Sequence, residues 1–274
     1  ANKLVFSKWR EALGGNIKAI ICGSAPLQPR LATVFTNAGI PILEGYGLTE
    51  CSPVISVVPF RKQEFRAGCV GKLLPSVHVK LAEDGEILVK APNVMLGYYK
   101  NEAETAKVFD AERWLLTGDI GEFTKEGYLK ITDRKKELFK TSGGKYVAPS
   151  PIENKLKESF LIEQIALQGD GEKYISALII PNFENLKEWA QNQAISFLSN
   201  DDLLENQHIK QLYKDIITEF NVNFGKVEQI KQFELLADEW TVENGLLTAT
   251  MKLKRKVIKE KYKDLIETFY NKIS

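Results

Sequence analysis

Residues 114–145 gather side chains suited to binding a phosphorylated ligand that carries hydroxyl groups. Asp119 follows a Thr-Gly pair, where its carboxylate would hold the two hydroxyls of a ribose. Arg134 and Lys136 lie in a dense charged run from Asp133 to Lys140. Gly143 and Gly144 follow, and glycine lets the backbone bend freely or approach a ligand closely. The stretch predicts a site that grips an anion and also contains a flexible segment.

A plainer interpretation of the same stretch stays open. A solvated β-hairpin followed by an ordinary linker has the same composition, because a charge run is usually a wet surface. Asp119 would then be a turn-forming residue. Other parts of the chain are needed to choose between the two.

A second candidate stretch, Glu44–Glu50 (EGYGLTE), follows a predicted strand. Tyr46 stands between Gly45 and Gly47, so its ring is free to present a flat face for a nucleotide base. The alternative is a glycine-rich turn without ligand.

Thr49 and Glu50, at the end of that stretch, add oxygen ligands. The hydroxyl of Thr49 is of the phosphate-binding type, and the carboxylate of Glu50 is a hard oxygen ligand suited to Mg²⁺. Both residues would equally cap a turn.

Two further segments are weaker signals by themselves. The turn Gly23, Ser24, Ala25 and Pro26 resembles any strand-to-helix turn. Lys252 stands before a basic helix start, where a mobile lysine would neutralise charge developing on a phosphoryl group. A basic surface segment, including one that faces a membrane, is the plain alternative.

Composition narrows the class of protein. The chain has 274 residues, 44% of them hydrophobic, with 37 basic and 36 acidic side chains. A balanced charge argues against a nucleic-acid binder. Three cysteines without metal spacing predict a reduced, cytoplasmic protein rather than a disulfide scaffold.

The fold is predicted to change character along the chain. Residues 17–44 predict a βαβ unit whose first strand, 17–22, is apolar enough to be buried in a parallel sheet. Residues 54–132 predict a small barrel or curled antiparallel sheet. Paired strands and helices after Ser150 predict a small α+β domain, with Asp133–Lys145 as the junction.

Three details of the α+β part are specific. Ser150 to Glu153 reads as a capping box with proline at the first helical position. Apolar spacing predicts one helix over 203–220 and one terminal helix over 253–270. An apolar strand so soon after Ala1, which is not preceded by Met, also predicts that the sequence starts inside a larger fold.

Taken together, the ordered motifs resemble the adenylate-forming acyl-CoA synthetases, most closely bacterial long-chain fatty acid–CoA ligases. The motifs are Glu44–Glu50, Gly85–Tyr98 (GEILVKAPNVMLGY), Trp114–Asp119 (WLLTGD), Gly127–Gly144 and Leu247–Arg255. The resemblance implies the end of a large α/β domain with a barrel-like subdomain (residues 1–135). A hinged α+β domain (136–274) would follow.

The resemblance also implies a reaction and its partners. A fatty acid, ATP and Mg²⁺ would give acyl-AMP and pyrophosphate, and CoA would then displace AMP. It implies a cytoplasmic enzyme, with peripheral contact at the inner membrane face as an option. The oligomeric state is left open.

Matched position by position, the resemblance gives the candidate residues roles. The nucleotide would contact Gly23–Pro26, Glu44–Gly47, Thr49, Asp119 and Arg134, and Glu50 would hold Mg²⁺. Lys252 and Thr49 would act in catalysis. Lys136 would be the hinge, and Gly143 and Gly144 would line the CoA path.

Two departures from the family pattern limit these expectations. The Ser/Thr/Gly-rich phosphate loop is absent from the sequence, which predicts that this chain is the C-terminal part of a longer enzyme and inactive by itself. Ala249 stands where the family usually has proline near the lysine. An acyl carrier protein ligase, another adenylating ligase, or a non-catalytic nucleotide-binding module are the alternatives.

Overall fold

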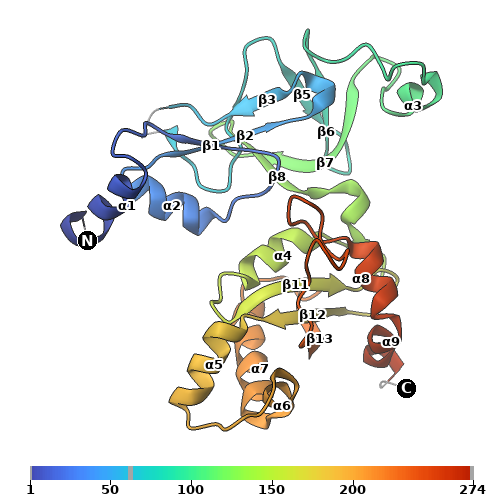
Figure 1. Ribbon diagram of the computed structural model, residues 1–274. Coiled ribbons are helices and arrows are strands. Elements are labelled where there is room, and N and C mark those ends of the chain that lie inside the picture. Colours follow the sequence, from blue (N-terminus) through green and yellow to red (C-terminus); the bar gives the residue numbers. More distant parts are fainter. Residues whose placement is uncertain (1, 61–63, 272–274) are drawn as a thin grey trace. The chain divides into compact units, whose positions relative to one another are not determined.

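The computed structural model describes residues 2–60 and 64–271, and its contacts divide the chain into two compact units (Figure 1). The first unit comprises residues 1–136 and the second residues 137–274. The fold is mixed α/β. We describe each unit by itself.

The first unit holds two four-stranded sheets. The first sheet runs in the order β1-β2-β3-β4, with β1 and β2 parallel and the remaining pairs antiparallel. Its strands are β1 (Ile20–Cys22), β2 (Ile42–Gly47), β3 (Val54–Val57) and β4 (Lys72–Leu73). Helical segments of this part are η1 (Asn2–Phe6), α1 (Ser7–Ala12), α2 (Pro29–Asn37) and η2 (Thr49–Cys51).

The second sheet is antiparallel throughout, in the order β5-β6-β7-β8. Leu129 at the start of β8 also bonds to Gly71 beside β4, so the sheets continue into one another as a half-barrel. The elements are β5 (His78–Leu81), β6 (Glu86–Lys90), α3 (Glu102–Lys107), β7 (Leu115–Phe123) and β8 (Leu129–Arg134). The predicted curled antiparallel sheet is therefore present.

The expectation of a buried first strand is only partly met. β1 pairs in parallel with β2, as the βαβ pattern predicts. However, the side chain of Ile21 is 78% exposed, and β1 contains no fully buried residue. Within the described residues, no layer covers the face of β1 that carries Ile21.

The second unit contains a three-stranded sheet of order β11-β12-β13 and a short hairpin, β9 with β10. Their bounds are β9 (Phe139–Lys140), β10 (Tyr146–Val147), β11 (Ile162–Gln168), β12 (Ile175–Pro181) and β13 (Ile230–Leu235). The helices are α4 (Pro149–Leu156), α5 (Phe183–Asn192), α6 (Asn200–Glu205), α7 (Gln207–Asn221), α8 (Arg255–Lys261) and α9 (Lys263–Asn271). The short 3-10 segment η4 (Lys135–Glu137) precedes them.

Apolar burial holds this unit together. Every residue of β12 is buried, and all but Ser176 are apolar; the Ser176 hydroxyl lies 2.8 Å from the Tyr270 hydroxyl, so it is hydrogen-bonded within the core. Helices bury one face against the sheet, and α4 contacts both β11 and α7. A fully buried Tyr213 on α7 donates a 2.7 Å hydrogen bond to the carbonyl of Leu161, which satisfies its hydroxyl inside the core.

Two predicted helices are each interrupted in the structure. The predicted helix over 203–220 is two helices, because Asn206 is extended and its side chain caps α7 by accepting from the His208 N–H. The predicted helix over 253–270 breaks at Tyr262, where φ is −107° and ψ is 22°.

The predicted capping box at Ser150 is also wrong. α4 begins at Pro149 with Ala148 as its N-cap, and no side chain caps it there. Glu153 instead lies buried and accepts a 2.9 Å bond from the Leu167 N–H, so tertiary contacts decide its role.

Candidate nucleotide site

Three of the predicted ligand-binding residues meet in the first unit around one carboxylate. The hydroxyl of Tyr46 donates a 2.8 Å hydrogen bond to Oδ2 of Asp119. Nε of Arg134 lies 3.1 Å from Oδ1 of the same carboxylate. An aromatic side chain and a guanidinium therefore both contact one carboxylate, although the three groups come from three separate strands.

Burial differs within this group. Asp119 is 4% exposed, whereas the side chain of Arg134 is 58% exposed. Burial and the charge of Asp119 raise the pKa of Tyr46 well above its ordinary value, so its ring stays neutral. The arrangement offers a solvent-reachable cation beside a shielded carboxylate.

Strand register places Asp119 and Arg134 together. β7 and β8 are antiparallel neighbours in which Asp119 pairs directly with Arg134. Directly opposed residues lie within reach of one another's side chains. A register irregularity follows between Ile120 and Gly121.

Glycine is required at Gly47, where the backbone of the EGYGLTE stretch passes very close to Pro53. A Cβ on Gly47 would lie 1.8 Å from the Pro53 carbonyl oxygen, which no side chain tolerates. The same carbonyl accepts a 2.8 Å bond from the Leu48 N–H. Gly47 thus lets the backbone pack against Pro53 immediately before the segment that carries Thr49 and Glu50.

The turn Gly23–Pro26 lies beside the same stretch. A Cβ on Gly23 would be 3.4 Å from the carbonyl oxygen of Gly45, and Cys22 pairs with Glu44 in the parallel ladder. Ser24 takes a left-handed backbone conformation with φ of 67°. The two segments predicted to lie near the nucleotide base, Gly23–Pro26 and Glu44–Gly47, therefore lie at the carboxyl ends of neighbouring parallel strands.

Glu50, the predicted metal ligand, accepts a 2.9 Å hydrogen bond from the hydroxyl of Tyr98. Thr49 is exposed at the start of η2. Across residues 2–60 and 64–271, no group of three His, Cys, Asp or Glu side chains could hold a metal ion. Glu50 offers one carboxylate, and that fits Mg²⁺, which commonly takes one or two carboxylates together with substrate phosphates.

Glu44 is a buried carboxylate with an unusual environment. It is 7% exposed, and among the described residues its Oε1 has no hydrogen-bond partner. Burial raises its pKa to about 7, while a hydrogen bond from the backbone of Gly68 works in the opposite direction. This group is poised to change charge near neutral pH.

Lys252 lies in the second unit, on an exposed loop closed by a bridge between Leu247 and Leu253. Thr248 holds the loop: its N–H donates 2.8 Å to the Lys252 carbonyl, and its hydroxyl accepts 3.0 Å from the Lys252 N–H. Met251 has a left-handed φ of 60°. The loop is a defined turn that presents a lysine.

The glycine pair lies on an exposed turn between β9 and β10. Gly144 has φ of 77° and donates to the Thr141 carbonyl, while the Ser142 N–H donates 2.9 Å to Glu172. Lys136, the predicted hinge, is exposed within η4 and is the last residue of the first unit.

Sequence reasoning missed an anchor next to these residues. Both nitrogens of the Arg255 guanidinium end bind the two carboxylate oxygens of Glu153 at 2.7 Å, and Nε lies 3.3 Å from Glu137. Burial by itself would lower the pKa of Arg255, but the bonds and charges of both glutamates raise it. The only sequence signal for this anchor was an arginine three positions after Lys252.

Known proteins share this architecture. The family model described as "AMP-binding enzyme" matches residues 2–99, and that described as "AMP-binding enzyme C-terminal domain" matches residues 137–274. The second match covers half of the chain. The chain belongs to the AMP-binding enzyme family.

Two curated relatives of this AMP-binding enzyme are named as long-chain-fatty-acid–CoA ligases. Long-chain-fatty-acid–CoA ligase FadD15 of Mycobacterium bovis is 39% identical over 272 residues, 99% of this chain and 45% of the relative. Long-chain-fatty-acid–CoA ligase 6 of Rattus norvegicus is 36% identical over 285 residues, 98% of this chain and 40% of the relative. The chain thus spans less than half the length of these relatives.

Solved structures agree on the fold. The adenylation domain of the carboxylic acid reductase from Segniliparus rugosus, in complex with AMP and a carboxylic acid, matches with a TM-score of 0.78. Its sequence is 26% identical, and the match covers 99% of this chain and 42% of that one.

Among the described residues, no helix combines the length and apolarity needed to span a membrane.

Proposed function

We propose that the protein takes part in activating a fatty acid with ATP, first to acyl-AMP and then to acyl-CoA. A carboxylate oxygen of the acid would attack the α-phosphorus, and the bond to pyrophosphate would break. The CoA thiol would then attack the acyl carbon and release AMP. The observation that carries the proposal is the convergence of Tyr46 and Arg134 on Asp119.

Each member of that group has a role in holding the nucleotide. The Tyr46 ring stacks on adenine, with Gly23–Pro26 near the base. Asp119 accepts from the ribose hydroxyls, and a carboxylate suits this because it offers two acceptor oxygens. The exposed guanidinium of Arg134 binds on the phosphate side.

Thr49 and Glu50 complete the phosphate end. The Thr49 hydroxyl donates to the α-phosphate, where negative charge changes during attack. Glu50 holds Mg²⁺ together with the nucleotide phosphates, and the ion neutralises phosphate charge when bound. Tyr98 fixes the Glu50 carboxylate by its 2.9 Å bond.

The second unit supplies the mobile parts in this proposal. Residues 136–274 act as a domain that turns about Lys136, since hinges absorb large backbone changes at few positions. In one orientation Lys252 stabilises the charge that develops during adenylation. In the other orientation the Gly143–Gly144 turn lines the path of CoA.

A binding experiment tests the nucleotide site. Calorimetry should detect AMP binding to the wild-type protein, and Asp119→Asn should weaken it at least about tenfold because a charged acceptor is lost. Absence of AMP binding to both this chain and the full-length gene product would refute the proposed site.

Activity of the full-length gene product tests the reaction. Pyrophosphate exchange should depend on a long-chain fatty acid, and Lys252→Ala should slow exchange strongly. The same variant should still form thioester from supplied acyl-AMP. Equal loss of both steps would contradict the role of Lys252.

A carrier-bound acceptor is the second candidate. The reductase adenylation domain, including a structure with its adjoining PCP domain, resembles this chain at 26% and 27% identity. An acyl carrier protein ligase would make acyl-AMP but not acyl-CoA. Mass spectrometry of products with CoA and with a phosphopantetheinylated carrier distinguishes the two.

A further inference from the structure

The backbone is irregular where β7 presents Asp119. Glu86 pairs with Ile120 and Leu88 pairs with Leu116, so the ladder advances two residues on β6 and four on β7. The bulge falls on Thr117, Gly118 and Asp119. Bulges beside functional sites commonly re-aim a side chain, and their extra residues lose ladder hydrogen bonds.

Side chains replace the lost ladder bonds. The Gly118 N–H donates 2.9 Å to Oε1 of Glu86, and Gly118 itself has φ of 72°. The Asp119 N–H donates 3.1 Å to the Thr117 hydroxyl, which donates 2.8 Å to the Ile87 carbonyl. The bulge is thus held by named groups, with Glu86 as the only charged one among these bonds.

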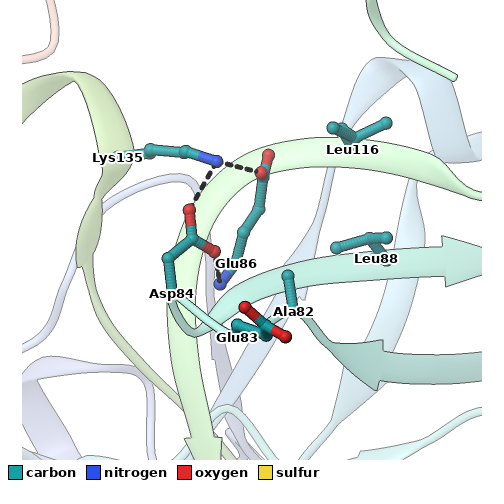
Figure 2. A pocket seen from close by; sticks show the side chains of 7 residues that line it. All are labelled: Ala82, Glu83, Asp84, Glu86, Leu88, Leu116 and Lys135. Atoms are coloured by element: carbon teal, nitrogen blue, oxygen red, sulfur yellow. Dashed lines mark hydrogen bonds and ion pairs between the residues drawn. The ribbon is translucent and has the colours of Figure 1, made fainter. Parts of the chain in front are cut away.

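The other oxygen of Glu86 reaches a different strand end. Oε2 accepts a 2.7 Å bond from Nζ of Lys135, the residue after Arg134. Figure 2 shows the Lys135 amine between Glu86 and Asp84, whose Oδ2 lies 2.6 Å away. Glu86 is 4% exposed, whereas Lys135 and Asp84 are exposed. These ion pairs raise the pKa of Lys135, and the hydrogen bond that its ammonium donates to Asp84 is the largest cause.

We infer that Glu86 is a positioning residue that fixes the spacing between Asp119 and Arg134. One carboxylate oxygen holds the bulge before Asp119, and the other holds the residue after Arg134. The two ligand-facing groups then keep one geometry when a ribose enters. This inference rests on the proposed nucleotide function.

A purely structural role for Glu86 is the competing explanation. A buried carboxylate paired with a lysine stabilises a fold only weakly in general, because desolvation offsets the attraction. The two roles differ in what they do to recognition. Loss of stability lowers the amount of active protein for every substrate alike, whereas misplacement of Asp119 affects only substrates that carry the hydroxyl it binds.

The decisive experiment compares ATP with 2′-deoxy-ATP in pyrophosphate exchange by the full-length protein. The ratio of the two kcat/KM values does not depend on the folded fraction. We expect Glu86→Ala to lower the wild-type preference for ATP by about tenfold, as loss of a charged hydrogen bond would. Glu86→Gln keeps an acceptor for Gly118 but loses the ion pair with Lys135, so its effect should be smaller.

Glu83 provides the matched control. It lies in the same turn, is exposed, and lines the same surface hollow of about 420 Å³ as Glu86 and Lys135. Glu83→Ala should leave the preference unchanged. If Glu86→Ala does not fold, Glu86→Gln and Lys135→Met carry the comparison. An equal fall of kcat/KM for both nucleotides would overturn the inference.

Hydrogen exchange gives a readout that does not depend on the reaction. Exchange of the Gly118 amide in the free protein should rise in Glu86→Ala and stay unchanged in Glu83→Ala. If the wild-type protein uses no nucleotide, the proposed function fails. Hydrogen exchange at the Gly118 amide still decides whether Glu86 holds the bulge. Unchanged exchange at Gly118 in Glu86→Ala would overturn the positioning role.

Discussion

The Tyr46 hydroxyl donates a 2.8 Å hydrogen bond to Asp119, 73 positions further along the chain. Tyr46 lies on β2 in one sheet and Asp119 on β7 in the other. Because the sheets join as a half-barrel, the ring and the carboxylate of the proposed nucleotide site are already paired in the protein without ligand. Such preorganisation lowers the entropic cost of binding.

Tyr46→Phe should weaken AMP binding and lower stability together. The ring remains for stacking, but the buried Asp119 carboxylate loses a donor, which costs about 1–2 kcal/mol of unfolding free energy. Calorimetry with AMP and denaturant unfolding measure the two effects. Tyr99→Phe is the matched control, since Tyr99 is 88% exposed. Unchanged affinity in Tyr46→Phe would argue against a coupled ring and carboxylate.

Glu44→Gln should change how stability depends on pH. The folded pKa of Glu44 is raised to about 7, so charging this group opposes folding as pH rises from about 4.5 through 7. Relative to the Gln variant, the wild type should lose about 2 kcal/mol of unfolding free energy between pH 5 and pH 8.

Unfolding in guanidinium at both pH values measures this difference. Glu83→Gln, an exposed glutamate of the same unit, should follow the wild type at both. A constant gap between wild type and Glu44→Gln across the range would show that Glu44 does not ionise in that window.

Arg255→Met should destabilise the second unit. It leaves the buried Glu153 carboxylate without its bidentate partner, which costs about 3 kcal/mol. Arg255→Lys keeps the charge but cannot form both bonds, so an intermediate loss is expected. Lys256→Met, an exposed neighbour, is the control. Equal stability of the Arg255 and Lys256 variants would refute this anchor.

Gly47→Ala should disrupt the first unit. The added Cβ would meet the Pro53 carbonyl at 1.8 Å, and relief requires a backbone shift that also moves Thr49. We expect a stability loss of about 2 kcal/mol or more, as for overpacked sites. Gly143→Ala, whose nearest atom would be 4.0 Å away, should cost far less. Similar unfolding midpoints for the two variants would contradict the close approach.

Local patterns predicted local structure well where neighbouring residues decide it. The parallel pairing of β1 with β2 and the curled antiparallel sheet β5-β6-β7-β8 follow from strand patterns and turn residues along the chain. The same local rules failed at two places. They missed the helix break at Asn206, and they placed a helix cap at Ser150 although the helix is capped at Ala148. In each case a nearby residue took the capping position. At Glu153 a partly buried arginine 102 residues away decides the outcome.

The family, the βαβ and antiparallel patterns, and the residue types of each motif are all predictable from the sequence. Motif order and turn chemistry are properties of the chain, so they can be read from it directly. The meeting of Tyr46 and Arg134 at Asp119, and the bridge that Glu86 makes between Gly118 and Lys135, become visible in the folded chain alone. Those contacts depend on strand register, and a bulge on β7 shifts that register in a way no local pattern specifies.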